Sequence, residues 1–152
     1  MRYSVRGGEE FELDTIVLDL NGCLSVHGEL VPGVEPRIVA LRESGFKIIL
    51  FTGDLRGTAA ELCGHLGIDF TLTQSSIEKE AEMVKLGPNC AAIGNARIDN
   101  GTFKHAKVSV LTLQAEGIHT GCLDKVDIIV PSINDALDLF LHPDSLTATL
   151  RE

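Results

Sequence analysis

TIVLDLNGCL, residues 15–24, is the stretch around which the rest of the chain is organised. Its first four residues predict a short buried strand, and Asn21-Gly22 predicts a turn directly afterwards. Asp19 therefore stands at the carboxyl end of a strand. Because ligands of open α/β sheets bind beyond this end of the strands, Asp19 is a candidate nucleophile or metal ligand. An aspartate at this position can equally well do no more than cap the turn.

The composition indicates one globular domain. The chain has 152 residues, of which 44% are hydrophobic, enough for a core of its own. No apolar run approaches the ~18 residues that a membrane-spanning helix needs, so we expect no membrane partner. Acidic residues within the first twenty positions are unlike a secretory signal, and we expect a cytoplasmic protein.

The charge of the chain restricts its ligands. With 13 basic and 22 acidic residues the net charge is -9, which disfavours binding to the phosphate backbone of a nucleic acid. A small anionic substrate is still compatible if a metal ion or a local lysine supplies positive charge. The cysteines form no CxxC pair, so we interpret them as reduced, small hydrophobic residues. They are Cys23, Cys63, Cys90 and Cys122.

Two hairpins are predicted in the first part of the chain. Residues 1–14 alternate apolar and polar residues around Gly7-Gly8 and predict an edge hairpin. Residues 24–31 alternate in the same way around His27-Gly28. We expect this second hairpin to form a small flap beside the carboxyl end of the strand that holds Asp19.

Strands and helices then alternate along the chain. Apolar positions at helical spacing predict helices at 33–44, 58–66, 77–86 and 133–141. Near-continuous apolar runs, typical of parallel strands covered on both faces, predict strands at 46–51, 70–72, 90–93, 108–113 and 126–130.

Each predicted helix has an apolar face that we expect to point toward the sheet. For the helix at 33–44 the face is Val34, Ile38 and Leu41, and for the helix at 58–66 it is Ala59, Leu62, Cys63 and Leu66. For the helix at 77–86 it is Ile77, Ala81 and Val84, and for the helix at 133–141 it is Ile133, Leu137 and Phe140.

The alternation predicts an α/β fold, with a mostly parallel sheet and right-handed crossovers that place helices on both faces. This is a three-layer, Rossmann-like architecture. We expect a single domain over residues 1–152, composed of the hairpin at 1–14, a core at 15–130 and C-terminal helices at 131–152.

Polar residues follow three of the predicted strands, where they could share one rim of the sheet. Each also has an ordinary alternative role as a helix cap or turn residue. The first strand is followed by Asp19 and Asn21, the second by Thr52, Gly53 and Asp54, and a later one by Gly94, Asn95 and Asp99.

Lys79 is unexpected in the first turn of its helix. The helix dipole makes a cation slightly unfavourable there, by ~0.3–1 kcal/mol. A nearby carboxylate or bound phosphate would explain the lysine, and so would neutralisation by Glu78 and Glu80 on a solvated face.

In order and spacing, these residues resemble the four motifs of the haloacid dehalogenase-like (HAD) phosphohydrolases. Residues 19–23, DLNGC, resemble the first motif, and Thr52 at the end of an apolar strand resembles the second. Lys79 resembles the third, and residues 94–99, GNARID, resemble the fourth. The resemblance covers about residues 15–130. Within the family, the chain is most similar to the soluble P-type ATPase-like subgroup.

The resemblance implies a role for each matching residue. Asp19 would be the nucleophile that forms an aspartyl-phosphate, while Thr52 and Gly53 would bind the phosphoryl group. Lys79 would pair with Asp19 and with the phosphate. The cofactor would be Mg²⁺, offsetting the repulsion between carboxylate and phosphate. Its ligands would be Asp19, the backbone carbonyl of Leu20, and the loop residues Asn95 and Asp99.

At two positions the chain departs from the family pattern. Asn21 stands where family phosphatases have an aspartate that acts as general acid and base, a role worth ~10²–10⁴-fold in rate. An amide cannot transfer a proton, so we expect slow hydrolysis, a persistent phosphoenzyme, or no turnover. Asn95 stands where an aspartate usually binds Mg²⁺, and an amide oxygen can still coordinate the ion but without a negative charge.

The segments between the motifs are too short to hold a cap domain. Capless relatives use a neighbouring subunit to cover the site or act on large substrates, so we expect a homo-oligomer acting on a small phosphorylated substrate or a phosphoprotein. The main alternative is a catalytically impaired member that binds a phosphorylated ligand or a partner protein. A receiver-like phosphorylation domain fits less well, because the paired acids expected early in such a chain are missing.

Overall fold

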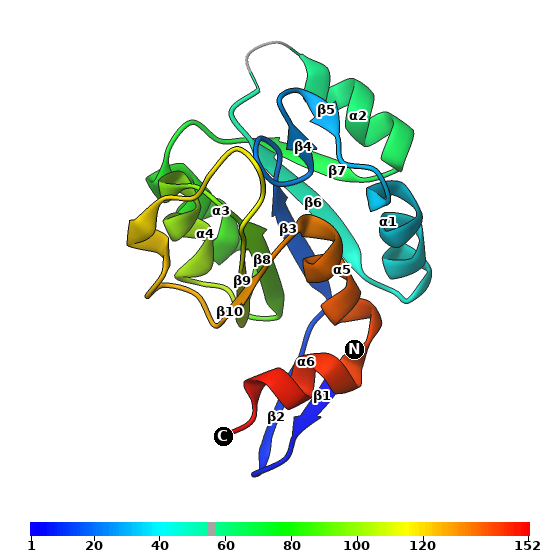
Figure 1. Cartoon of the computed structure of the whole chain (residues 1–152), viewed down its shortest axis with the longest axis vertical. Helices are drawn as coiled ribbons and strands as arrows, with labels where there is room; N and C mark the ends of the chain where they lie inside the picture. The colour runs from blue at the N-terminus through cyan, green and yellow to red at the C-terminus, as the bar shows by residue number, and fades with distance from the viewer. Residues whose placement is uncertain (55–56) are drawn as a thin grey trace.

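The computed structural model describes residues 1–54 and 57–152. In this part of the chain, six parallel strands form the main sheet in the order β10-β9-β8-β3-β6-β7 (Figure 1). The strands are β3 (Thr15–Asp19), β6 (Lys47–Thr52), β7 (Asp69–Leu72), β8 (Cys90–Gly94), β9 (Val108–Thr112) and β10 (Ile128–Val130).

Strand β3 lies in the middle of the sheet because its first four residues are buried on both faces. It pairs in parallel with β6 on one side and β8 on the other, with Asp19 opposite Phe51 of β6. The carboxyl ends of these three strands therefore meet at one rim, as expected for a parallel sheet.

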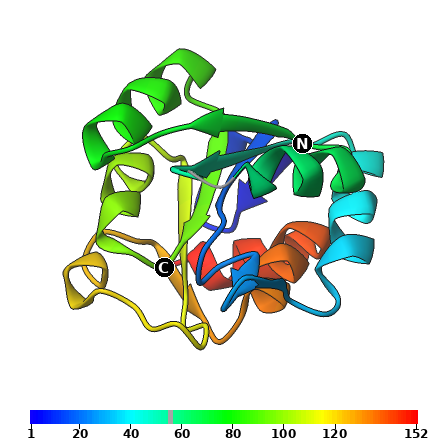
Figure 2. The same ribbon diagram turned by 90° about the horizontal axis from the view of Figure 1, so that it is seen from above.

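Helices cover both faces of the sheet (Figure 2). The helices α1 (Val34–Glu43), α2 (Thr58–Leu66) and α5 (Ile133–Leu141) contribute to one core with the sheet residues of that face. The helices α3 (Ser76–Leu86) and α4 (Asn100–Phe103) pack against the opposite face. The predicted three-layer α/β fold is confirmed.

The predicted inward faces of α1 and α5 are confirmed, because their six named residues are all buried. On α2, Ala59, Cys63 and Leu66 are buried while Leu62 is only half-buried.

The inward face predicted for α3 is wrong. Ile77 and Val84 are 80% and 60% exposed, and the buried residues of the helix are Lys79 and Met83. Lys79 forms two ion pairs at the rim of the sheet, so the helix turns its lysine inward and its apolar stripe outward. An apolar stripe is a poor guide where a buried charge pair sets the rotation of a helix.

The N-terminal hairpin forms, but it is not an edge of the main sheet. Strands β1 (Arg2–Val5) and β2 (Glu9–Glu12) make an antiparallel sheet of their own, which projects from the core beside α6 (Pro143–Leu150) (Figure 1). Tyr3 stacks on Phe11, with 5.1 Å between ring centroids, and this pair joins the apolar core.

The predicted flap is confirmed as the hairpin of β4 (Ser25–Val26) and β5 (Glu29–Leu30). Its turn residue His27 has φ 51°, in the left-handed region. Between the strand ends of β3 and β6, the described chain holds only this flap and α1, so it has no room for a cap there. None of the described helices is long and apolar enough to cross a bilayer.

Candidate active site

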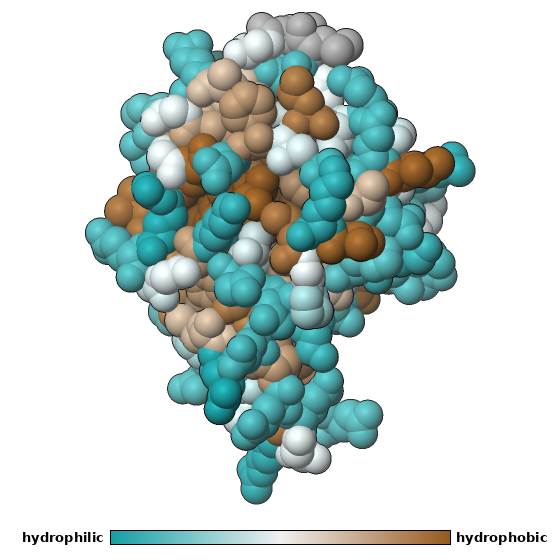
Figure 3. All heavy atoms as spheres, turned by 180° about the vertical axis from the view of Figure 1, so that it is seen from behind, coloured by the Kyte–Doolittle hydropathy of each residue, from teal (hydrophilic) through white to brown (hydrophobic). Residues whose placement is uncertain are grey.

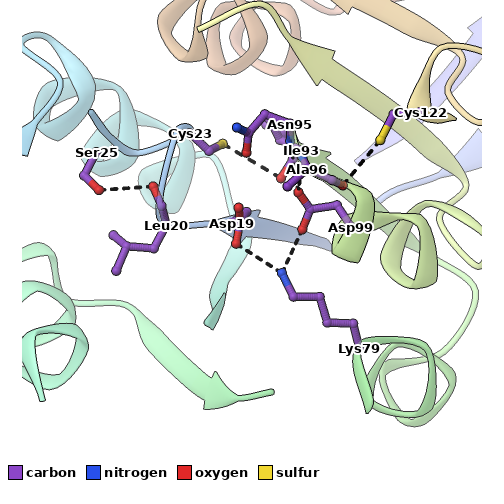
Figure 4. A network of polar contacts seen from close by, with 10 residues as sticks. All are labelled: Asp19, Leu20, Cys23, Ser25, Lys79, Ile93, Asn95, Ala96, Asp99 and Cys122. Carbon is purple, nitrogen blue, oxygen red and sulfur yellow. Dashed lines mark hydrogen bonds and ion pairs between the residues drawn. The ribbon is translucent and has the colours of Figure 1, made fainter. Parts of the chain in front are cut away.

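The centre of the site is a buried lysine between two carboxylates (Figure 4). Lys79 Nζ lies 3.1 Å from Asp19 Oδ1 and 2.7 Å from Asp99 Oδ1. The side chains of Lys79 and Asp99 are both 2% exposed, and that of Asp19 is 12% exposed. The structure thus joins residues that are 60 and 20 positions apart in the chain.

Each member of this cluster comes from the end of an element. Asp19 is the last residue of β3, and Asp99 ends the 3₁₀ turn η1 (Arg97–Asp99) after β8. Lys79 lies in the first turn of α3, whose N-terminus is capped by Ser75 through a hydrogen bond from the Glu78 amide. The two carboxylates explain why the helix tolerates a cation at its positive end.

Burial changes the acidity of the cluster. It raises the pKa of Asp19 to about 7, an effect that Asp99 strengthens and Lys79 opposes. Burial also acts to lower the pKa of Lys79, but the two carboxylates more than compensate and raise it. The lysine is therefore charged, and the Asp19 carboxylate lacks sufficient positive charge nearby to ionise fully at neutral pH.

The loop after β8 is folded around Asp99. Its Oδ2 accepts hydrogen bonds of 3.0 Å from the backbone amides of Asn95 and Ala96. A Cβ on Gly94 would lie 2.5 Å from the same oxygen, so only glycine allows the strand to come this close. Asp99 thereby fixes the conformation of the loop and the position of Lys79.

Asn95 presents an unpaired oxygen to the site. Its Nδ2 donates a 3.0 Å hydrogen bond to the Gly117 carbonyl, while its Oδ1 is buried and has no hydrogen-bond partner. Gly22, at φ 73°, makes room for this side chain, because a Cβ there would lie 2.3 Å from Asn95 Nδ2. An orphaned buried carbonyl oxygen costs free energy unless a ligand such as a cation satisfies it.

These groups fit a hard divalent cation. Mg²⁺ prefers oxygen ligands and is commonly held by one or two carboxylates together with substrate phosphate. The Asp19 carboxylate and the orphaned oxygen of Asn95 would hold it. No group of three or more His, Cys, Asp or Glu side chains with metal-binding geometry occurs among the described residues.

The Leu20 carbonyl, predicted to be a metal ligand, accepts hydrogen bonds within its own turn, and its contact with a metal stays a prediction. Its oxygen accepts them from the amides of Cys23 and Ser25 and from the Ser25 hydroxyl. These donors close the turn into the flap, and Figure 4 shows the contact from the Ser25 hydroxyl. The carboxylate of Asp99 is engaged too, by Lys79 and two amides, so its contact with a metal stays a prediction.

Thr52 and Gly53 stand on the neighbouring strand end. Thr52 is the last residue of β6 and is 2% exposed, one position beyond the residue paired with Asp19. Gly53 follows it and lines a cleft. Asp54 instead accepts hydrogen bonds from the Thr58 hydroxyl and the Ala59 amide at the start of α2. It therefore has the helix-capping role that was the alternative for each of these polar residues.

A cleft of about 600 Å³ opens beside this rim. Its walls come from the turn after β3, the flap, the start of α2 and the loop after β9, represented by Asn21, His27, Thr58 and Glu116. The exposed Asn21 faces this cleft. Glu116 accepts a 3.0 Å hydrogen bond from the His27 amide, which ties the flap to the loop on the far side.

Some participants were not predicted from the sequence. Glu116 lies in a loop without a motif, and only the fold brings it to the cleft, 89 positions from His27. Gly22 and Gly94 were noted as parts of motifs, but the clashes that make them necessary are tertiary. Cys23 is fully buried, and burial raises its pKa well above the usual range, so the interpretation as a packing residue holds.

Solved structures with the same fold are phosphatases. The cobalt-bound deoxy-D-mannose-octulosonate 8-phosphate phosphatase of Haemophilus influenzae superposes with a TM-score of 0.75 at 17% identity, over 90% of this chain and 92% of that one. The Moraxella catarrhalis enzyme, solved with magnesium, phosphate and its sugar, gives a TM-score of 0.74 at 18% identity and the same coverage. At these identities, the likeness establishes the fold.

A relative in sequence is the uncharacterised protein MJ0073 of Methanocaldococcus jannaschii, 38% identical over 73 residues, which are 47% of this chain and 78% of that protein. The chain belongs to the same family as MJ0073. Together with the structural neighbours, one of them described as a HAD family hydrolase, this places the family on the haloacid dehalogenase-like fold. No family model matches the chain.

Two further relatives connect this HAD-like family to P-type ATPases. A soluble P-type ATPase-like phosphatase of M. jannaschii is 23% identical over 91% of this chain and 54% of its own length. The probable copper-transporting ATPase HMA5 of Arabidopsis thaliana is 37% identical over 64% of this chain but only 10% of its own length. The predicted resemblance is confirmed, and the neighbours support a hydrolase of the phosphatase type.

Proposed function

We propose that this protein is a Mg²⁺-dependent phosphohydrolase or phosphotransferase that forms an aspartyl-phosphate on Asp19. The observation that carries the proposal is the buried lysine that bridges Asp19 and Asp99 at the rim of the sheet. A cation held at 3.1 Å from a carboxylate orients it and offsets the charge of an incoming phosphoryl group.

The chemistry follows from the positions of these groups. Lys79 holds Oδ1 of Asp19, so Oδ2 is the oxygen that attacks phosphorus. The bond between phosphorus and the leaving oxygen breaks, and its electron pair stays on that oxygen. Thr52 hydrogen-bonds the phosphoryl group from the next strand end. A bound Mg²⁺ would supply further charge neutralisation, held by Asp19 and Asn95.

In this mechanism Asn21 limits the reaction rate. Asn21 lines the cleft, where a proton would pass to the leaving group. Its side-chain amide cannot act as the acid that transfers this proton. The leaving group therefore departs unassisted, and water attacks the phosphoenzyme without a general base. We expect the aspartyl-phosphate to persist.

A second candidate function is favoured by the two asparagines. With Asn21 and Asn95 in place of acids, the protein would bind a phosphorylated ligand or a phosphoprotein without turnover. The intact Asp19, Lys79 and Asp99 favour the enzyme. The substrate in either case is a small phosphorylated molecule or a phosphoprotein, and the homo-oligomer that would cover the open cleft is part of the proposal.

Phosphorylation of the protein separates the two. The protein is incubated with Mg²⁺ and acetyl phosphate, and the phosphorylated residue is located by mass spectrometry. If the protein is an enzyme of this type, covalent phosphate is found on Asp19 of the wild type and is absent in Asp19→Asn. The control Asp69→Asn, whose altered side chain is exposed on β7, should still be phosphorylated. If the wild type gives no phosphoprotein and releases no phosphate, and Asp19→Asn behaves in the same way, the proposed enzyme activity is contradicted.

A cytoplasmic location is proposed on the state of the cysteines. All four are free and buried, and none is paired in a disulfide. Free thiols persist in reducing compartments.

A further inference from the structure

A small second cavity adjoins the active-site cleft, beneath the flap. Its volume is about 130 Å³, and it lies between the flap hairpin and α2. Four of its lining residues also line the larger cleft, so the two spaces communicate. The shared residues are Leu20, Asn21, Gly28 and Thr58.

The cavity presents an apolar surface. Leu20, Leu30 and Leu62 face it from the turn after β3, from β5 and from α2. The two hydroxyls at its wall are already engaged, because Ser25 donates to the Leu20 carbonyl and Thr58 donates to Asp54. No charged side chain is among its described lining residues. Such a surface binds water weakly and gains free energy when an apolar group fills it.

The size of the cavity matches one aromatic ring. An apolar cavity of about 150 Å³ in another protein stays dry and takes up benzene. A space of about 130 Å³ that opens on one side holds a ring whose substituent points out into the cleft.

The lack of a proton donor at position 21 also favours an aromatic leaving group. Asn21, which lines both spaces, cannot protonate a leaving oxygen. A phenol has a pKa of about 10, whereas that of water is about 15.7, so a phenolate departs without protonation far more readily than an alkoxide of water-like basicity.

We propose that the cavity under the flap is the leaving-group site of this enzyme and that its substrates are phosphate esters of a phenol. The inference rests on the proposed function. Asp19 Oδ2 forms the bond to phosphorus, the bond between phosphorus and the phenolic oxygen breaks, and the electron pair leaves with the phenolate. The phenolate later takes a proton from solvent. The ring sits between the three leucines while its oxygen lies at Asn21.

Filling the cavity tests the inference by a change in substrate preference. Leu62→Phe places a ring in the space, and Leu30→Phe does so from the opposite wall. Either variant should lower kcat/KM for phenyl phosphate about ten- to a hundredfold, the equivalent of losing one buried ring. Acetyl phosphate, whose leaving group is too small to need the cavity, should keep its kcat/KM within about twofold. Val39→Phe, at an exposed position of α1, is the matched control.

The outcomes are distinguishable from failure of the proposed function. Equal losses on both substrates, or no loss on phenyl phosphate in either variant, would overturn the leaving-group site while acetyl phosphate turnover still supports the enzyme. If neither substrate is turned over, binding of phenylphosphonate and methylphosphonate with Mg²⁺ is measured by calorimetry. The inference then requires wild type to prefer the phenyl compound and Leu62→Phe to lose that preference, and it fails otherwise.

Discussion

In the proposed mechanism, the reaction rate depends on Asn21. It is exposed in the cleft, and its side-chain amide cannot transfer a proton to a leaving group. The surrounding machinery is nevertheless assembled, with Lys79 between two carboxylates. The proposed mechanism gives the chain a nucleophile, Asp19, without a proton donor at position 21, and it therefore predicts accumulation of the covalent intermediate.

Restoring the acid should shorten the life of that intermediate. Asn21→Asp places a carboxylate where it can activate water, and general base catalysis is worth ~10²–10⁴-fold. We expect the decay of phosphorylated protein, followed by the loss of radiolabel after a chase, to accelerate by about 10²-fold. Asn89→Asp, outside the described cleft, is the control. An unchanged decay rate in an active protein would remove the proton-transfer explanation of position 21.

The raised pKa of Asp19 predicts how stability depends on pH. Because its folded pKa is about 7 and its ordinary value is 3.8, the folded state binds the proton more tightly than the unfolded state. This contribution to stability is complete below pH 4 and is lost as the pH rises through 7. Asp19→Asn, which has no charge to bury, should therefore gain stability over wild type as the pH increases.

Without metal, we expect Asp19→Asn to exceed wild type by on the order of 1–3 kcal/mol at pH 8, and by less at pH 5. Urea unfolding in EDTA at both pH values measures the difference. The exposed control Asp69→Asn should show no such trend. A difference that shrinks toward pH 8 would contradict the assignment of a strained, buried carboxylate.

Asn95 predicts opposite effects with and without Mg²⁺. In Asn95→Asp a carboxylate oxygen replaces the amide nitrogen that lies 3.0 Å from the Gly117 carbonyl, so the metal-free protein should lose about 1–3 kcal/mol. The added charge should tighten Mg²⁺ binding roughly tenfold. Thermal melts over a Mg²⁺ titration give both quantities. Equal Mg²⁺ shifts in variant and wild type would place the metal away from residue 95.

At the scale of the element, the strands and most helices could be predicted because their patterns are local. The parallel strands are apolar runs, and α1 and α5 have one apolar face each. The orientation of α3 was not predictable in this way, since it depends on partners of Lys79 that lie 60 and 20 positions away. The four-residue helix α4 was missed too, because about one helical turn is too short for an apolar pattern to repeat.

In the candidate site, too, residues placed by local patterns could be predicted, whereas contacts that depend on the folded chain could not. Asp19, Lys79 and Asp99 could be predicted because strand ends and helix starts place them, and the structure joins them in one cluster. The role of the Leu20 carbonyl as a metal ligand stays a prediction, and the sequence did not show that this oxygen accepts hydrogen bonds within its own turn. Contacts such as that of Glu116 with the flap belong to loops without a periodic pattern, and they become visible only in the folded chain.

The rotation of α3 can be tested by truncating side chains on its two faces. Met83 is fully buried beside Val17 and Ile49, so Met83→Ala should lower the free energy of unfolding by about 2–5 kcal/mol. Ile77→Ala and Val84→Ala, on the exposed stripe, should each change it by no more than about 0.5 kcal/mol. Chemical denaturation measures all three. A large loss at Ile77 with none at Met83 would mean that the helix faces the other way.

At the scale of the molecule, the edge strand β7 exposes two large apolar side chains. Figure 3 shows separate apolar patches on one face of the molecule, divided by hydrophilic side chains. Phe70 and Leu72 are 40% and 56% exposed on β7, the strand at one edge of the sheet. Within the described chain β7 pairs only with β6, so its other edge keeps unpaired backbone groups. Natural proteins protect such an edge with charges, with a covering element or with a partner.

This edge is suited to a second copy of the chain. The stretch 70–77, FTLTQSSI, has no charged residue in a protein of net charge -9, so two copies can meet there without repulsion at the contact. Antiparallel pairing of β7 with its counterpart, centred on Thr71, would place Phe70 opposite Leu72 and Asp69 opposite Thr73. No two carboxylates would then face each other across the twofold axis.

We therefore expect a dimer in solution, and charge placed on β7 should dissociate it. Light scattering after gel filtration should give about twice the mass of the chain for wild type and a monomer for the double variant Phe70→Lys and Leu72→Lys. The control Val39→Lys, on α1, should remain dimeric. Circular dichroism establishes that the monomeric variant is folded. A monomeric wild type, or a double variant that stays dimeric, would contradict the pairing of two β7 edges.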